Sequence, residues 1–329
     1  TGSTITLDET GNTFGTLGLT GNQATVQNIA DPQLGDVNVA TLTVNATGAV
    51  TQAGATSLTV TSATSITATE DILLANAANA IAGDVTLSGE DINLDAGGDI
   101  TLGALTASNA ASDMTIPGAG DVTIAGGAVA FSASPTGVND LDVIATGDIT
   151  QTVAISITGD ADLSAPMSAI NLNDAANDFQ GRVDAAASAI TLYDANDLEL
   201  GLINADTLVA NAGGDITDQG AKIEARNLAS FTAGDDINID TLDTHVFTSG
   251  VALSADQIIR FAATGTLGLN SVSATNMTDV VNRITATGGM TLDGVITTAG
   301  VSDLTLDTTN GNVLQSAGSL TTDALSLNT

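Results

Sequence analysis

The second half of the chain repeats the first, and this self-similarity constrains its fold more than any other feature of the sequence. Residues 1–19 match residues 166–184, which places Phe14 over Phe179. The segment "LGDVNVATLTVNATGAVTQAGA" matches "LGLINADTLVANAGGDITDQGA", which places Leu34 over Leu200. A long internal period of this kind is typical of repeat architectures.

We therefore predict two long repeat units, residues 1–165 and 166–329, which form one continuous solenoid. Neither unit begins or ends with a distinct polar cap, although solenoids need such caps at their true ends. This predicts that the chain is an internal fragment of a longer array.

Each unit contains a shorter rhythm of apolar runs, separated by Gly, Asn and Asp every seven to ten residues. The stretch "AGGDIT" occurs at Ala96–Thr101 and again at Ala212–Thr217. Short runs with alternating apolar residues, bounded by turn formers, predict β-strands. We expect the glycines to adopt positive φ at a corner and the aspartate to bond its own turn, with Ile100 or Ile216 pointing inward.

Strands this short are stable only when each one pairs with its equivalent in the next turn of the chain. The sequence thus predicts an all-β fold, a parallel β-helix (β-solenoid) with about 20 residues per coil. The alternative is a pair of β-sandwiches, but the Asn-Gly hairpin turns typical of sandwiches are scarce. Only 2% of the residues are aromatic, which suits a narrow core of small aliphatic side chains.

The formal net charge is −33, from 38 acidic and 5 basic residues. Nucleic acid is excluded as a partner because its binding needs a basic surface. No run of 18 apolar residues is present, so we expect no membrane insertion. There is no cysteine, so no disulfide can stabilise the fold.

Nothing in the sequence predicts an enzyme. The only histidine is His245, expected to be a surface or packing residue, and no G-x-S-x-G motif is present. The carboxylate pairs Glu90–Asp91 and Asp235–Asp236 have the chemistry for glycoside hydrolysis, but pairs arise by chance in so acidic a chain.

Divalent cations are the partner class that this charge favours. The stacking of coils would align Asp99, Asp148, Asp215 and Asp236 along corners, where calcium would relieve their repulsion. The alternative is that each aspartate caps a turn and faces water. No cofactor is required, and calcium is the one cofactor that remains open.

Two threonine-rich runs, residues 41–51 and 56–70, raise ice binding as a further alternative. Thr is also a common strand residue on exposed faces, and it stacks well in ladders. The runs are too irregular for a flat lattice, which favours the strand interpretation.

One segment carries a more specific resemblance. The chain has N-D-F-x-G-x-V at 177–183, then L-x-D-A-N-x-L-x-L-G at 192–201, then A-G-G-x-I-T-x-x-G at 212–220. This style resembles the repeat regions of filamentous haemagglutinin-like exoproteins, which are bacterial surface adhesins. The resemblance implies a right-handed parallel β-helix, secretion to the cell surface and a role in a fibre.

The favoured function is therefore the structural shaft of a secreted or cell-surface bacterial fibre. Its partners would be neighbouring repeat units, other copies of the fibre, and a host or neighbouring cell surface reached through parts outside this chain. The alternative is a calcium-dependent carbohydrate- or cell-binding β-helix surface.

Overall fold

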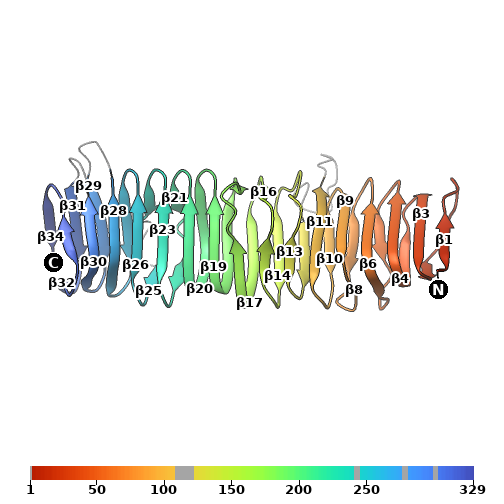
Figure 1. Cartoon of the computed structure of the whole chain (residues 1–329), viewed down its shortest axis with the longest axis horizontal. Coiled ribbons are helices and arrows are strands. Elements are labelled where there is room, and N and C mark those ends of the chain that lie inside the picture. Colours follow the sequence, from red (N-terminus) through yellow and green to blue (C-terminus); the bar gives the residue numbers. More distant parts are fainter. Residues whose placement is uncertain (1, 108–121, 241–244, 276–280, 299–302) are drawn as a thin grey trace. The chain divides into compact units, whose positions relative to one another are not determined.

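The computed structural model describes residues 2–107, 122–240, 245–275, 281–298 and 303–329, and all regular structure within them is β-strand (Figure 1). Every strand pairing whose register is known in these ranges is parallel, as for β7 (Ile72–Ala75) with β10 (Ile92–Asp95). A β-sandwich would contain antiparallel hairpins, so this alternative was wrong. The predicted parallel β-solenoid is confirmed.

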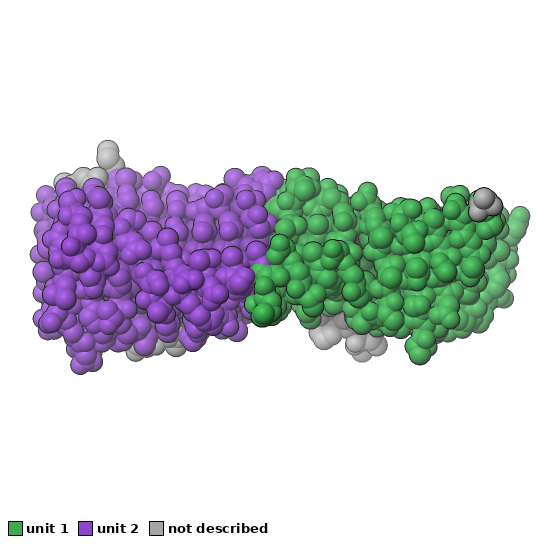
Figure 2. Space-filling view, turned by 60° about the horizontal axis from the view of Figure 1, so that its bottom comes forward, with its two compact units in different colours: residues 1–168 green, residues 169–329 purple. Residues whose placement is uncertain are grey.

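The chain divides into two compact units, residues 1–168 and 169–329, which Figure 2 colours separately. The strands of unit 1 are β1 (Thr4–Leu7), β2 (Leu17–Thr20), β3 (Gln23–Ile29), β4 (Gln33–Ala46), β5 (Val50–Gln52), β6 (Leu58–Thr67), β7, β8 (Ala80–Ile81), β9 (Asp84–Gly89), β10, β11 (Ile100–Ala107), β12 (Val122–Gly126), β13 (Val129–Phe131), β14 (Leu141–Ala145), β15 (Ile149–Gln151), β16 (Ser156–Ile157) and the first part of β17 (Ala161–Leu172).

The strands of unit 2, after the end of β17, are β18 (Asp178–Phe179), β19 (Arg182–Asp194), β20 (Leu198–Ala212), β21 (Ile216–Asp218), β22 (Ile223–Ala225), β23 (Ala229–Ala233), β24 (Ile237–Ile239), β25 (Val246–Phe247), β26 (Val251–Ala255), β27 (Ile259–Ala263), β28 (Leu267–Ala274), β29 (Val281–Ala286), β30 (Met290–Thr298), β31 (Asp303–Thr308), β32 (Val313–Gln315), β33 (Ser319–Thr321) and β34 (Leu325–Asn328).

Each strand pairs with the strand one coil away, so the strands of a unit stack in rows (Figure 1). In unit 1, one row runs β5–β7–β10–β12–β14. In unit 2, one row runs β21–β24–β27–β29–β31–β34.

The register of these pairs gives the length of a coil. Ile72 lies beside Ile92 in unit 1, and Ile237 lies beside Ile259 in unit 2. Averaged over the solenoid, a turn takes roughly 21 residues. The expected coil length is thereby confirmed.

The core is a narrow column of inward-facing side chains, because alternate residues of each strand face inward. In unit 1 most of these are Val, Leu and Ile, such as Ile72 and Leu74, both fully buried. The core of unit 2 is also mostly aliphatic, and in addition it packs Phe231, Phe247 and Phe261 against one another, with ring centroids 5.1 to 5.9 Å apart. No helix among the described residues is long and apolar enough to cross a membrane.

Candidate functional site

The corner aspartates bond the backbone of the next coil. Asp99 Oδ1 accepts the N–H of Ala128 at 2.9 Å, Asp215 Oδ1 accepts that of Asp236 at 2.8 Å, and Asp236 Oδ1 accepts that of Ile258 at 2.8 Å. The bond that we expected from such an aspartate to its own turn is therefore not what holds these corners. The carboxylate fastens one coil to the next, at a point where the backbone turns and strand bonds end.

The structure brings together only two of the four predicted calcium candidates. Asp215 and Asp236 occupy the same corner in consecutive coils, and Asp197 occupies it one coil earlier. Asp99 and Asp148 lie in the other unit, and Ala128 stands at the corner of the coil between them. The backbone carbonyl of Asp148 accepts the N–H of Val129 at 2.9 Å.

Glycines at these corners make room for the carboxylates. A Cβ on Gly127 would collide with Asp99 Oδ1, and a Cβ on Gly214 would collide with Asp197 Oδ1. The same pairing of an aspartate with a glycine in the next coil recurs at Asp31 with Gly48, Asp140 with Gly159, and Asp184 with Gly201.

The expectation of positive φ at the "AGGDIT" glycines was wrong. Gly97, Gly98, Gly213 and Gly214 are not among the residues with positive φ. At Gly97, Gly213 and Gly214 the reason for glycine is the close approach of the neighbouring coil. Gly98 differs, because a Cβ there would have open space around it.

The stacked carboxylates of unit 2 influence one another. Burial, and then the neighbouring charges of Asp236 and Asp197, raise the pKa of Asp215, although the bond from the N–H of Asp236 opposes this rise. Among the described residues, no three or more His, Asp or Glu side chains are placed to hold a metal ion. Whether calcium binds at these corners stays untested.

An acidic depression lies in unit 1, and sequence reasoning missed it. Asp140, Asp142, Asp160 and Asp162 line a hollow of about 210 Å³. They form two rows, because Asp142 pairs with Asp162 across β14 and β17 and Asp160 donates its N–H to Asp140 at 2.8 Å. Burial raises the pKa of Asp142.

Rows two residues apart along a strand are separated by about 7 Å, and neighbouring coils by about 4.8 Å. The signal in the sequence was the doubled spacing of aspartates in "NDLDV" and "GDADL".

A second hollow, of about 350 Å³, lies in unit 2. It is lined by Asp178, Phe179, Gln180, Asn196 and Asp197. Its polar side chains already bond one another, since Asn196 Nδ2 donates to Asp178 Oδ1 at 3.1 Å and Gln180 Nε2 donates to Asp178 Oδ2 at 2.9 Å.

The single histidine is completely buried and uses both ring nitrogens. The backbone N–H of Ile223 donates to His245 Nδ1 at 3.1 Å, so the ring proton lies on Nε2, which donates to Asp218 Oδ2 at 3.0 Å. Both side chains are 0% exposed. His245 is therefore a packing residue, as one of the two expectations had it, and its nitrogens are not offered to a substrate.

The two carboxylate pairs singled out for hydrolysis occupy corners as well. Asp91 donates its N–H to Asp71 Oδ1 at 3.3 Å, and its neighbour Glu90 donates its N–H to the carbonyl of Glu70 at 3.0 Å. Asp235 Oδ1 accepts from Gln257 Nε2 at 2.6 Å, beside the coil-to-coil bond of Asp236. Each pair thus contributes bonds between coils.

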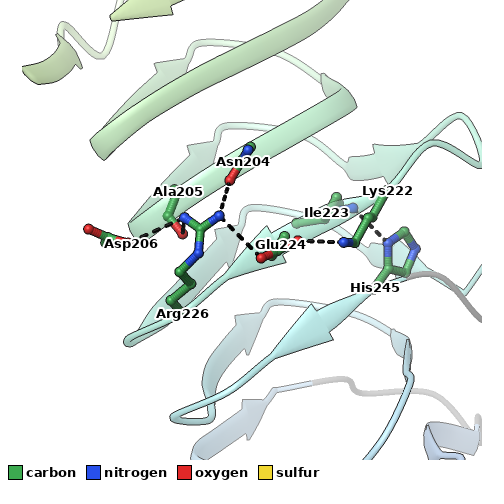
Figure 3. A network of polar contacts seen from close by, with 8 residues as sticks. All are labelled: Asn204, Ala205, Asp206, Lys222, Ile223, Glu224, Arg226 and His245. Atoms are coloured by element: carbon green, nitrogen blue, oxygen red, sulfur yellow. Dashed lines mark hydrogen bonds and ion pairs between the residues drawn. The ribbon is translucent and has the colours of Figure 1, made fainter. Parts of the chain in front are cut away.

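Basic residues sit in networks between strands of neighbouring coils (Figure 3). Arg226 donates to Asn204 Oδ1 at 2.7 Å and pairs with Asp206 and Glu224, both at 3.3 Å. Lys222 pairs with the other oxygen of Glu224, and its hydrogen bond lowers the pKa of that carboxyl. These cations therefore bind carboxylates of their own unit.

Hydroxyl side chains stack in a row on an outer face of unit 1. Thr25 pairs with Thr43, Thr43 with Ser65, and Ser65 with Thr86. The adjacent row includes Asn45, so threonine does not repeat in both directions as an ice lattice would require. The row is a strand ladder of the kind expected from the sequence, and ice binding stays untested.

Three segments of the chain match one known family of repeats. Residues 21–88, 119–186 and 187–254 each match the family model described as repeats of unknown function (DUF5649). The first match begins at position 21 and the third at position 187, an offset equal to the one that places Leu34 over Leu200. No curated protein and no solved structure matches the chain. Because the three matches take up more than half of its length, the chain belongs to the DUF5649 repeats, as a tandem-repeat β-solenoid.

Proposed function

We propose that this chain is the structural shaft of a secreted or cell-surface bacterial fibre. In this role the β-solenoid carries mechanical load and holds a binding element, located elsewhere in the fibre, away from the cell. Its partners are further repeat units, and a host or neighbouring cell is contacted through parts outside this chain.

One observation carries the proposal: the same bond between an aspartate and the next coil recurs in both units. It is made by Asp31 and Asp99 in unit 1, and by Asp197, Asp215 and Asp236 in unit 2. A chain that repeats a fastening along its length, rather than concentrating polar groups at one place, suits a load-bearing element. The resemblance to filamentous haemagglutinin-like repeats supports the same role.

The deciding experiment is immunogold labelling of intact cells of the source bacterium, with an antibody raised against residues 1–329. We expect labelling on unpermeabilised cells, along extended structures. A cytosolic protein serves as the control, because it should be labelled only after permeabilisation. If the chain behaves like that control, the proposal of a surface fibre fails.

A further inference from the structure

One outer sheet face of unit 2 carries no charge. It is formed by parts of β19, β20, β23, β26, β28 and β30, which lie side by side in that order (Figure 1). Two rows of outer residues cross these strands, and we call them together the neutral face. They are Thr191, Val209, Ser230, Ala252, Ser271 and Val295 in one row, and Tyr193, Asn211, Thr232, Ser254, Ser273 and Thr297 in the other.

The alternation of side chains along each strand turns these two rows outward. The residues between the rows, such as Leu192, Phe231 and Leu253, are buried in the core. Every residue of the neutral face is at least partly exposed, and Val295 is 56% exposed. The neutral face is therefore a surface that a partner can reach.

The other strand rows of unit 2 do carry charge. In the row that contains β27 and β29, Arg260 pairs in register with Arg283. In the row that contains β20 and β22, Asn204 pairs with Glu224. Contact through either of these rows would take ions out of water, which is costly. In a chain with a net charge of −33, the neutral face can be covered without that cost.

The corresponding rows of unit 1 are more polar. At the offset of the long repeat, Thr43 occupies the position of Val209, and Thr86 occupies the position of Ala252. Asp84 also lies on the outer side of β9, two residues before Thr86. Removing valine from water is favourable, whereas burying a hydroxyl without a hydrogen-bond partner is not. The face of unit 2 is thus better suited to contact than that of unit 1.

We propose that the neutral face of unit 2 packs against the neutral face of a second copy of this chain, so that two molecules lie side by side. Both faces have the same spacing of about 4.8 Å between coils, so each coil of one molecule can meet a coil of the other. Stacked rows of small side chains interdigitate well between two sheets. Because both copies use the same surface, the contact is isologous and closes as a dimer.

Charge at the border of the neutral face makes the association depend on salt. The exposed residues Asp235 and Asp256 follow the ends of β23 and β26. An uncharged centre with a charged rim is the usual anatomy of a protein interface. The rim carboxylates of two copies repel each other, and at about 0.15 M salt the Debye length is about 8 Å. The dimer fraction is therefore expected to rise with added salt.

The test is sedimentation velocity of the full chain over a series of concentrations. The variant S254D places a carboxylate within the neutral face. Its matched control A262D adds the same charge to the next strand, β27, where Ala262 is also partly exposed. A second control, T43D, adds it to the corresponding row of unit 1. Circular dichroism verifies that every variant retains its strands.

Tyr193 provides a second measurement on the same face. It is the only tyrosine of a chain without tryptophan, so the intrinsic fluorescence arises from this residue. Quenching by acrylamide should weaken as the protein concentration rises, because the second copy covers the ring. In S254D the quenching should be the same at every concentration.

We expect a monomer–dimer equilibrium for the unmodified chain, A262D and T43D, and a monomer for S254D. An unmodified chain that is monomeric at every concentration would overturn the proposal and leave the neutral face to another occupant, such as a neutral polysaccharide. Dimers that persist in S254D, or that T43D disrupts equally, would also overturn it, because the contact would then lie elsewhere.

This proposal goes beyond the proposed function and does not rest on it. A shaft that lies on the cell surface as single molecules would keep the immunogold labelling and show no dimer. An intracellular protein that pairs through the neutral face would show the reverse.

Discussion

Asn79 in unit 1 and His245 in unit 2 occupy the same position of the long repeat, at the offset that also places Leu34 over Leu200. Asn79 is almost fully buried; its Oδ1 accepts the N–H of Leu58 at 2.9 Å, and its Nδ2 donates to Gln52 Oε1 at 3.0 Å. An amide therefore supplies one acceptor and one donor between neighbouring coils.

In unit 2 the same bonds are made by ionisable groups. His245 takes the place of Asn79, Ile223 that of Leu58, and Asp218 that of Gln52, and the two side-chain partners are 27 residues apart in both units. The comparison teaches that the position requires an acceptor and a donor on one planar group. A histidine paired with an aspartate meets this requirement.

The largest expected effect comes from His245→Ala. The substitution removes the imidazole donor of the buried Asp218 carboxylate, and an unsatisfied buried polar group costs about 1–3 kcal/mol, and more when that group is charged. Hydrogen–deuterium exchange followed by mass spectrometry should show faster exchange in peptides of unit 2 around Ile223, with unit 1 unchanged.

The counterpart of this variant is Asn79→Ala, which should loosen unit 1 instead. It breaks neutral hydrogen bonds, and an unsatisfied buried neutral group costs about 1–3 kcal/mol. If each variant lowered protection from hydrogen–deuterium exchange equally in both units, the interpretation that Asn79 and His245 each stabilise their own unit would be wrong.

The next largest loss of stability is expected at Gly127, which leaves space for the carboxylate of Asp99. Gly127→Ala would place a methyl group against Asp99 Oδ1 and its backbone, and overpacking of this kind costs about 1–3 kcal/mol. The control is Gly98→Ala in the preceding coil, where a Cβ meets nothing within 4 Å. Urea unfolding followed by circular dichroism should separate the two variants; equal midpoints would contradict the steric explanation.

A smaller effect is expected when unit 2 receives the pair found in unit 1. In the double variant D218Q/H245N the donor and acceptor pattern is restored in neutral form, so the cost should stay below that of His245→Ala by about 2 kcal/mol or more. Exchange rates around Ile223 report the result. A double variant as unprotected as His245→Ala would mean that the charge of the pair, and not its bonding pattern, is what unit 2 requires.

Lowering the pH should change the stability of the two units by different amounts, and this difference should be smaller than the effects of the substitutions above. Burial raises the folded pKa of Asp142 in unit 1 and of Asp194 and Asp215 in unit 2. A carboxyl whose folded pKa is raised binds protons more readily when folded, so stability increases as the pH falls from 7 through that raised pKa.

We therefore expect the thermal midpoint at about pH 5 to exceed that at pH 7, with the larger gain in unit 2, because protonation there also relieves repulsion along the corner. The variant D215N should reduce the gain. A midpoint that falls steadily over the same range would contradict the sign.

The smallest effect is expected from calcium. The corner carboxylates already accept backbone N–H groups, and the net charge of −33 is screened by any salt. Thermal midpoints in calcium chloride and in sodium chloride of equal ionic strength should then agree. A rise specific to calcium that disappears in D215N/D236N would instead identify these adjacent corners as a cation site, whereas Ala128 separates Asp99 from Asp148 in unit 1.

Much of the fold could be predicted because its determinants are local and periodic. Alternation within short strands placed residues such as Ile100 and Ile216 in the core, where both are buried. The nearly constant offset between the two repeats could align them without any structure. What could not be predicted was the partner of each corner carboxylate, since the next coil lies anywhere from 18 to 29 residues away.

The buried His245–Asp218 pair illustrates the same limit. The two residues are 27 apart, which is more than one coil, so no pattern within a coil relates them. The alignment of the two repeats places Gln52 over Asp218 and Asn79 over His245. This correspondence predicts the His245–Asp218 hydrogen bond only when the bond between Gln52 and Asn79 is already known. For the same reason sequence reasoning expected glycine to serve its own turn, whereas Gly127 and Gly214 serve the carboxylate of another coil.

The pairing of an aspartate with a glycine one coil later limits how such a gene can grow. A duplication that adds a complete repeat unit keeps each of these aspartates opposite its glycine. A duplication that adds a fraction of a coil places residues with a Cβ opposite the aspartates. It also removes the carboxylates that accept the backbone N–H groups at the corners. Lengthening by complete units is thus the change that the molecule tolerates at once, without any compensating mutation.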